Sequence, residues 1–162
     1  MAHVGARLLR SWRLPSGLRV ELHLTPDIVS RPPGGRCDAL ANPANPQLVG
    51  TRLPYFPMLD LEPPPGLRAS SQWCGMEAGP GMFYPRQVVD GLVHAHGGSE
   101  MAERCRALPE VAPGGVRCPT GSAAVTPATG ELLAWYDHVV HVAPPTYGEA
   151  SWREALFECY HA

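Results

Sequence analysis

The sequence predicts an α/β fold with a mixed sheet. Apolar runs of strand length alternate along the chain with segments whose apolar residues recur at helical spacing, which is the pattern of α/β domains. The 162 residues are enough for one domain with a core, and they contain no internal repeat or heptad pattern. We therefore expect residues 1–162 to form a single domain.

Composition and charge exclude several partners. All 13 basic residues are arginine and the formal net charge is -2, which argues against non-specific nucleic-acid binding. No apolar run is long enough to span a membrane, so we expect no membrane partner. The arginine-rich start is compatible with a transit peptide, but its pattern favours a strand. We expect an intracellular protein, cytoplasmic or nuclear, with an organellar location left open.

The cysteines and histidines show no metal-ligand spacing. The five cysteines contain no C-x-x-C pair, and their odd number predicts reduced thiols rather than a complete disulfide framework. His94 and His96 lie two residues apart, which places them on different faces of a helix. We therefore expect no metal and no cofactor.

Two N-terminal segments predict a β-hairpin. Residues 7–13 and 18–25 mix apolar and charged side chains, and a Pro-Ser-Gly turn at 15–17 separates them. The second segment alternates, which predicts that its apolar residues face the core. These residues are Leu18, Val20, Leu22 and Leu24.

The most site-like stretch is a short apolar run that ends in two asparagines. Residues 37–41 predict a buried strand, and Asn42 and Asn45 follow at its carboxyl end, where open α/β sheets place ligands. Amide side chains suit sugar hydroxyls. The alternative is an ordinary Asn/Pro turn. Asp27, after the second strand, either accepts from an amino group or caps the next element.

Residues 51–86 predict an irregular excursion, because prolines and glycines leave little room for helix or strand. Its aromatic residues indicate either a wall or lid beside the asparagines, or rings that only attach the loop to the body. A helix is expected over 86–98, ending at Gly97-Gly98, with Asp90 in its first turn. A carboxylate there either stabilises the helix dipole or belongs to a site.

The remaining elements complete the sheet. Ser99 is the expected cap of a second helix over 99–108, with Met101, Cys105 and Leu108 on its apolar face. Buried strands are expected at 123–126 and 136–143. A terminal helix over 149–162 carries its large apolar side chains on one face. These side chains are Trp152, Leu156, Phe157 and Tyr160.

Taken in chain order, these elements and motifs resemble those of a macro domain, the α/β fold that binds ADP-ribose. Pro-Asp-Ile at 26–28 stands where the family has Gly-Asp-Ile, and Asp-Ala-Leu-Ala-Asn-Pro-Ala-Asn at 38–45 matches Asp-Ala-Ile-Val-Asn-Ala-Ala-Asn. Residues 88–97 are similar to the Val-Asp-Gly-x-Ile-His helix start. Residues 118–126 and 137–144 match the two strands that follow.

The resemblance implies a three-layer α/β/α fold with a mixed sheet. The chain also departs from the family pattern in two places. Residues 51–86 replace a run of glycines that lets backbone approach the distal ribose and phosphates. The strand, Gly-rich phosphate loop and last strand–helix pair that continue the family pattern do not follow Ala162. We therefore expect a divergent fold that is incomplete at its C-terminus.

The resemblance also implies roles for site residues. Asp27 would accept from the adenine amino group, with Ile28 against the ring. Asn45 would hold the distal ribose, and Asp90 would orient or activate the water in the hydrolytic branch of the family. The helix start would present N–H groups to the pyrophosphate. The expected ligand-binding set is Asp27, Ile28, Asn42, Ala44, Asn45, Val89, Asp90 and Gly91, with Asn45 and Asp90 as the catalytic pair.

Three functions follow from these expectations. The first is binding of ADP-ribose, a related nucleotide diphosphate sugar or an ADP-ribosylated protein. The second is metal-independent hydrolysis that removes ADP-ribose from proteins or cleaves O-acetyl-ADP-ribose. A carboxylate and fixed amides suit the positive charge that develops at the anomeric carbon. The third is a non-binding remnant or a protein-interaction module.

Overall fold

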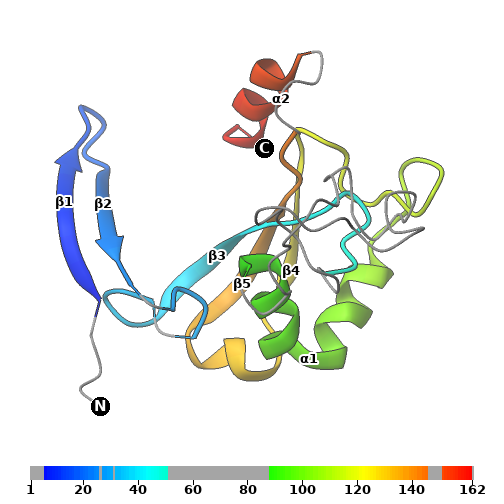
Figure 1. Ribbon diagram of the computed structural model, residues 1–162, viewed down its shortest axis with the longest axis horizontal. Coiled ribbons are helices and arrows are strands. Elements are labelled where there is room, and N and C mark those ends of the chain that lie inside the picture. The colour runs from blue at the N-terminus through cyan, green and yellow to red at the C-terminus, as the bar shows by residue number, and fades with distance from the viewer. Residues whose placement is uncertain (1–5, 26, 31, 51–87, 146–150, 162) are drawn as a thin grey trace, which may run out of the picture.

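The computed structural model describes residues 6–25, 27–30, 32–50, 88–145 and 151–161. Its elements form a two-stranded sheet, a three-stranded sheet and three helices (Figure 1). The strands are β1 (Arg7–Arg13), β2 (Arg19–Leu24), β3 (Cys37–Pro43), β4 (Ala123–Pro127) and β5 (Tyr136–Val142). The helices are α1 (Val89–Ala107), the 3₁₀ helix η4 (Gly130–Ala134) and α2 (Trp152–Cys159).

The three-stranded sheet is mixed, as predicted. Its order is β3-β5-β4, with β5 parallel to β3 and antiparallel to β4. The chain leaves β3, passes through α1 and β4, and returns as β5 beside β3. Parallel strands end at the same edge of a sheet, so the residues that follow β3 and β5 lie close together. The α/β class predicted from the sequence is therefore confirmed.

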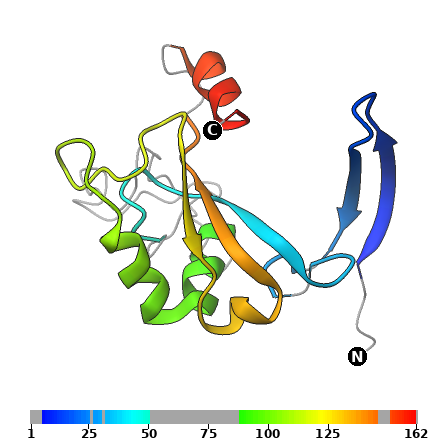
Figure 2. The ribbon, with the colours of Figure 1, turned by 180° about the vertical axis from the view of Figure 1, so that it is seen from behind.

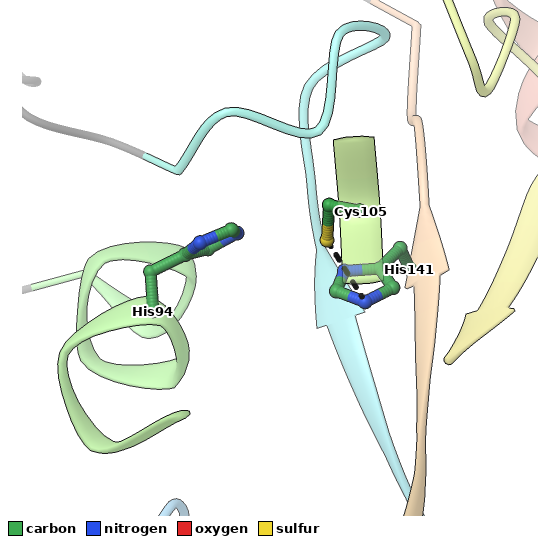
Figure 3. Close-up of side chains that lie close together, drawn as sticks. All are labelled: His94, Cys105 and His141. Atoms are coloured by element: carbon green, nitrogen blue, oxygen red, sulfur yellow. Dashed lines mark hydrogen bonds between the residues drawn. The ribbon is translucent and has the colours of Figure 1, made fainter. Parts of the chain in front are cut away.

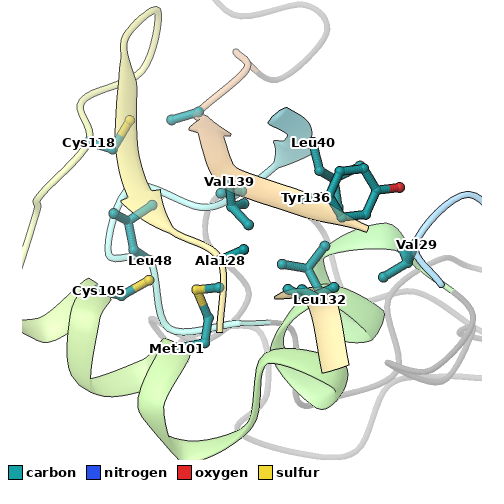
Figure 4. Packing of buried hydrophobic residues seen from close by; sticks show 13 residues of the cluster. Val29, Leu40, Leu48, Met101, Cys105, Cys118, Ala128, Leu132, Tyr136 and Val139 are labelled. Carbon is teal, nitrogen blue, oxygen red and sulfur yellow. The ribbon is translucent and has the colours of Figure 1, made fainter. Parts of the chain in front are cut away.

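One face of this sheet packs against α1 and forms the core (Figure 4). Leu40 on β3 pairs with Val139 on β5, which pairs with Thr126 on β4, and all three are buried. Met101 and Cys105 from α1 close over this row, as their helical spacing predicted. The expected apolar face of residues 99–108 is thus confirmed for these two residues.

Helix α1 bends at Gly98, where the sequence predicted a break between two helices. The Gly98 backbone has φ 68° and ψ -162°, which is outside the helical region and favours glycine. The hydroxyl of Thr129 donates to the carbonyl of Gly97 at 2.7 Å, so the bend also docks the segment that leads into η4. The sequence did not predict η4, because five residues are too few to show a helical period.

The hairpin β1–β2 forms as predicted, but the inward orientation of its leucines was wrong. Leu18, Leu22 and Leu24 are 60%, 51% and 55% exposed. The two strands pair with each other as a separate sheet, and Figures 1 and 2 show the hairpin standing apart from β3, β4 and β5. Alternation predicts that side chains share a face, but not that another element covers that face.

Other surfaces are also more open than predicted. Strand β3 was expected to be buried, but it lies at the edge of the described sheet, and Ala39 and Ala41 are exposed. Val125 on β4 is 55% exposed. Helix α2 is shorter than the expected 149–162, and none of its described residues is buried. The face of the sheet opposite α1 has no covering helix among the described residues. No described helix is long and apolar enough to cross a membrane.

Tyr136 connects the segment between β2 and β3 to the core, because its buried hydroxyl donates to the carbonyl of Ile28. Burial raises the pKa of Tyr136 to about 12, with smaller contributions from Cys37 and Asp27. The unfolded value is about 10. Because the folded pKa lies above the unfolded one, the contribution of protonated Tyr136 to the free energy of unfolding is complete below pH 10. This contribution is lost as the pH rises toward 12.

Replacing Tyr136 with phenylalanine therefore has two expected effects in urea unfolding. At pH 8 the variant should be less stable by about 1 kcal/mol, because one hydrogen bond is lost. Between pH 10 and 11 its free energy of unfolding should fall less steeply than that of the unmodified protein. Tyr160→Phe, at a side chain that is 82% exposed, is the matched control. If the free energy of unfolding fell equally steeply between pH 10 and 11 in the unmodified protein, Tyr136→Phe and Tyr160→Phe, the raised pKa could not belong to Tyr136.

Candidate functional site

The end of β3 and the start of α1 meet through Asn42 and Asp90. Both residues are buried, with exposed fractions of 0% and 4%. The amide nitrogen Nδ2 of Asn42 donates to Oδ1 of Asp90 at 2.9 Å, across 48 positions of sequence. The structure thus brings together two of the predicted site residues. It places the carboxylate in the first turn of α1, as expected from the sequence.

A buried histidine extends this contact into the sheet. His141 on β5 pairs with Asn42 in the register, and its Nδ1 lies 3.3 Å from Asn42 Nδ2. Its Nε2 lies 2.9 Å from the hydroxyl oxygen of Thr126 on β4. An amide nitrogen carries two hydrogens, so Asn42 can donate to both Asp90 and Nδ1. This places the imidazole proton on Nε2, where Thr126 Oγ1 accepts it.

His141 is held in its neutral form. Burial lowers its pKa to about 4; the charge of His94 acts in the same direction, and Asp90 opposes it. A neutral imidazole can serve as a hydrogen-bond partner or as a metal ligand at neutral pH. The sequence did not single out His141, because residues 136–143 predicted only a buried strand.

Two further side chains of types that can ligate metals lie beside this network. His94 is one turn beyond Asp90 on α1, with 3.7 Å between its Nε2 and Asp90 Oδ1. Cys105 is fully buried, and its Sγ is 3.8 Å from His141 Nε2. Burial, reinforced by Asp90, raises the pKa of Cys105 to about 11, so the thiol is protonated at neutral pH. Sequence spacing could not reveal this group, because its members come from two halves of a bent helix and a strand.

The loop after β3 holds Asn45 and Ala44. The Ala44 N–H donates to the carbonyl of Val142 at 2.7 Å, which continues the β3–β5 pairing beyond β3. Asn45 is 7% exposed, and its Oδ1 accepts from the N–H of Val49 at 3.1 Å. The side-chain oxygen therefore shapes the loop, while the Nδ2 group is the part suited to donate to a ligand. The role of Asn45 toward a sugar stays a prediction.

Asp27 caps its own turn. Its Oδ1 accepts from the N–H groups of Val29 and Ser30 at 3.0 Å each. Burial raises the pKa of Asp27, but the hydrogen bonds from Ser30 and Val29 together outweigh this and lower it. The capping interpretation is confirmed, and the adenine contact stays a prediction. Neighbouring Ile28 is 45% exposed and so offers apolar surface at this point.

The first turn of α1 offers backbone donors. Val88 is the N-cap residue and makes no side-chain cap hydrogen bond. Val89 is half-buried and Gly91 is buried, so this turn lies against the body of the protein. The first N–H groups of a helix have no partner within the helix, and they favour anions. The predicted pyrophosphate contact of Val89, Asp90 and Gly91 is compatible with this geometry and stays a prediction.

Three kinds of comparison relate the chain to known proteins. A family model for the macro domain matches residues 81–162, which is half of the chain. A macro domain-containing protein of Xanthomonas campestris pv. campestris is 42% identical over 74 residues, covering 44% of this chain and 39% of that protein. A similar protein of Cupriavidus necator is 39% identical over 74 residues, with the same coverage.

Solved macrodomain structures from Oceanobacillus iheyensis share the fold. A mutant form matches 99% of this chain and 59% of its own chain, with a TM-score of 0.57 and 15% identity. The same macrodomain solved with ADP matches 99% of this chain and 60% of its own, with a TM-score of 0.55 and 16% identity. The chain thus spans about three fifths of these structures, and its matched segment spans 39% of the curated relatives.

A double-mutant cycle tests the contact between β3 and α1. Replacing Asn42 with alanine should lower the free energy of unfolding by about 1.5–3 kcal/mol, because a buried carboxylate loses a hydrogen-bond donor. The effect should shrink in an Asp90→Ala background, giving a coupling of about 0.5–3 kcal/mol in urea unfolding. Asn42→Ala paired with Glu103→Ala, on an exposed part of α1, should be additive. Additivity in the Asn42/Asp90 cycle would show that the bond contributes nothing.

Proposed function

We propose that this chain, which belongs to the macro domain family, binds ADP-ribose or a related nucleotide diphosphate sugar. The observation that carries the proposal is the buried hydrogen bond between Asn42 and Asp90. It fixes a carboxylate at the carboxyl end of the parallel strands β3 and β5, where α/β sheets hold ligands. The solved relative with ADP supports this ligand class.

Each part of the proposed ligand has a matching group on the chain. Asn45 donates its Nδ2 hydrogens to the distal ribose, while its Oδ1 accepts from the Val49 N–H. The first turn of α1 binds the pyrophosphate through its N–H groups. At the adenine end, Asp27 accepts from the amino group through carboxylate lone pairs that do not cap its own turn. The exposed Ile28 packs against the ring.

We extend the proposal to the domain as a whole. Residues 1–162 form one macro-like domain, and residues 51–86 are an insertion that lies outside the described residues. The open face of the sheet is where the third layer of an α/β/α arrangement would pack. The apolar character of this face supports that arrangement, because Ala39, Ala41 and Val125 are exposed there. The biological ligand is ADP-ribose itself or an ADP-ribosylated protein.

Calorimetric titration with ADP-ribose tests the binding proposal. We expect one site per chain with a dissociation constant below about 1 mM, which corresponds to about -4 kcal/mol. Asn45→Ala and Asp27→Asn should each weaken binding at least about tenfold, because each removes one good hydrogen bond to the ligand. The second variant keeps an oxygen that can cap the turn at Val29 and Ser30.

Asp137→Asn is the matched control for the titration. Asp137 is exposed on β5 and pairs with Arg36, so its loss should leave the dissociation constant unchanged. Absence of heat at millimolar ADP-ribose, with a folded protein by circular dichroism, would refute the binding function. That result would favour the interaction-module alternative.

A second candidate, hydrolysis of an ADP-ribosyl linkage, is favoured by the pairing of Asp90 with His94 at 3.7 Å. A carboxylate next to an imidazole can orient a water molecule and accept its proton. If the chain is a hydrolase, release of ADP-ribose from a modified protein should fall by about 10²-fold or more in Asp90→Asn. Chromatography of the released nucleotide measures this rate. Activity that survives both Asp90→Asn and Asn45→Ala would exclude the mechanism.

A further inference from the structure

Three metal-binding side chains meet in the core beside Asp90. His94 and Cys105 come from the two halves of α1 on either side of the Gly98 bend, and His141 comes from β5. One ligand atom from each of the three lies within 4.8 Å of the other two. Figure 3 shows His94 reaching toward Cys105 and His141, which are joined by the 3.8 Å contact.

We propose that His94, Cys105 and His141 form a binding site for a thiophilic divalent cation, with Zn²⁺ as the best match. Imidazole nitrogen and thiolate sulfur are both ligands of Zn²⁺, and Asp90 is close enough to add a carboxylate oxygen, whereas Mg²⁺ and Ca²⁺ prefer oxygen ligands alone. The three proposed ligands are not residues proposed above to contact the nucleotide sugar, but Asn42 and Asp90 lie next to both sites. The metal proposal does not depend on ADP-ribose binding.

The distances suit zinc after a small contraction. Bonds of about 2.3 Å to sulfur and 2.0–2.1 Å to nitrogen at a tetrahedral angle place the two atoms about 3.6 Å apart. The observed separation between Cys105 Sγ and His141 Nε2 is 3.8 Å. All three ligand atoms lie within 4.8 Å of one another, so a pair at that limit must shorten by roughly 1.2–1.5 Å to reach tetrahedral zinc distances. Rotation about the side-chain bonds of His94 can supply this movement.

Charge in the core favours a cation at this position. The carboxylate of Asp90 lies 3.7 Å from His94 Nε2, and it is nearly fully buried. A bound Zn²⁺ displaces the Cys105 proton to solvent and leaves a thiolate. The thiolate and Asp90 then supply two negative charges for one dication. This neutrality removes most of the cost of burying each ion alone.

Asn42 can act as the outer partner of the metal-bound histidine. When Nε2 of His141 binds the metal, its Nδ1 must carry the ring proton and needs an acceptor. Oδ1 of Asn42 is buried and has no hydrogen-bond partner among the described residues. Turning the amide brings this oxygen to Nδ1 and releases Asp90 from its Asn42 hydrogen bond, so that the carboxylate can turn toward the metal.

Gly50 positions the third ligand. Its backbone has φ 71°, and a Cβ built at this residue would lie 2.5 Å from Cγ of His94. Any side chain at position 50 therefore pushes the imidazole away from its observed place, without changing a donor atom. Gly50→Ala is thus a test of geometry that leaves all three ligands present.

Titration of the metal-free, full-length chain with Co²⁺ tests the proposal, followed by competition with Zn²⁺. We expect one Co²⁺ per chain, visible bands typical of tetrahedral cobalt, and a near-ultraviolet thiolate-to-metal band. Cys105→Ser should abolish that band and weaken binding more than about 100-fold. This loss exceeds the roughly 10–100-fold loss of affinity caused by removing a residue that only hydrogen-bonds a metal ligand. Asn42→Ala should weaken binding by about 10–100-fold, and Gly50→Ala should also weaken it.

The matched control is Cys37→Ser. The Cys37 thiol contacts the carbonyl of Gly35, and Cys37 lies at the start of β3, away from the cluster at its end. This variant should keep both the band and the affinity. Failure of the folded, unmodified protein to bind one Co²⁺ or Zn²⁺ would overturn the proposal. Retention of the thiolate band in folded Cys105→Ser, or an unchanged affinity in folded Gly50→Ala, would also overturn it.

Discussion

The structure depends on one buried polar contact, the hydrogen bond from Asn42 to Asp90. A carboxylate in the core is costly unless a donor replaces the water that it loses. Asn42 supplies that donor from the last part of β3, and Asp90 occupies the first turn of α1. The bond therefore fixes the end of the sheet relative to the start of the helix. The loop that carries Asn45 leaves β3 at this same point.

The contact belongs to a polar layer inside an otherwise apolar interface. Asn42, His141 and Thr126 continue it across all three strands. Asn42 stands opposite His141 in the register, whereas Thr126 stands opposite Val139. Hydrogen-bonded polar groups in a core admit fewer packing arrangements than methyl groups, since each atom needs its own partner. This layer favours one register between strand and helix, and the side chains of His94, Cys105 and His141 lie next to it.

The apolar surfaces of the chain divide into covered and open ones. The sheet face toward α1 is closed by Met101, Cys105 and Val93. The opposite face exposes Ala41 and Val125, and the hairpin exposes its leucines. Exposed apolar groups that are contiguous usually mark surfaces that pack against something else. The solved macrodomains that the chain matches are longer than the chain, which covers 59% and 60% of them.

The sequence by itself determined the local elements and the family. Turn residues at 15–17 defined the hairpin, and helical spacing placed Asp90 in a first turn. Four blocks in order carried the macro domain resemblance, and the blocks from residue 88 onward lie within residues 81–162, which the family model matches. These features depend on neighbouring residues, so a linear pattern contains them.

Only the tertiary structure decided which faces are covered and which distant residues meet. Alternation grouped Leu22 and Leu24 on one face, but no local signal shows whether a partner covers it. The cluster of His94, Cys105 and His141 was likewise hidden. Cys105 lies 36 positions from His141 in the sequence, and the bend at Gly98 separates Cys105 from His94. Residues so far apart come together through the parallel pairing of β3 with β5 and the packing of α1, which no spacing rule encodes.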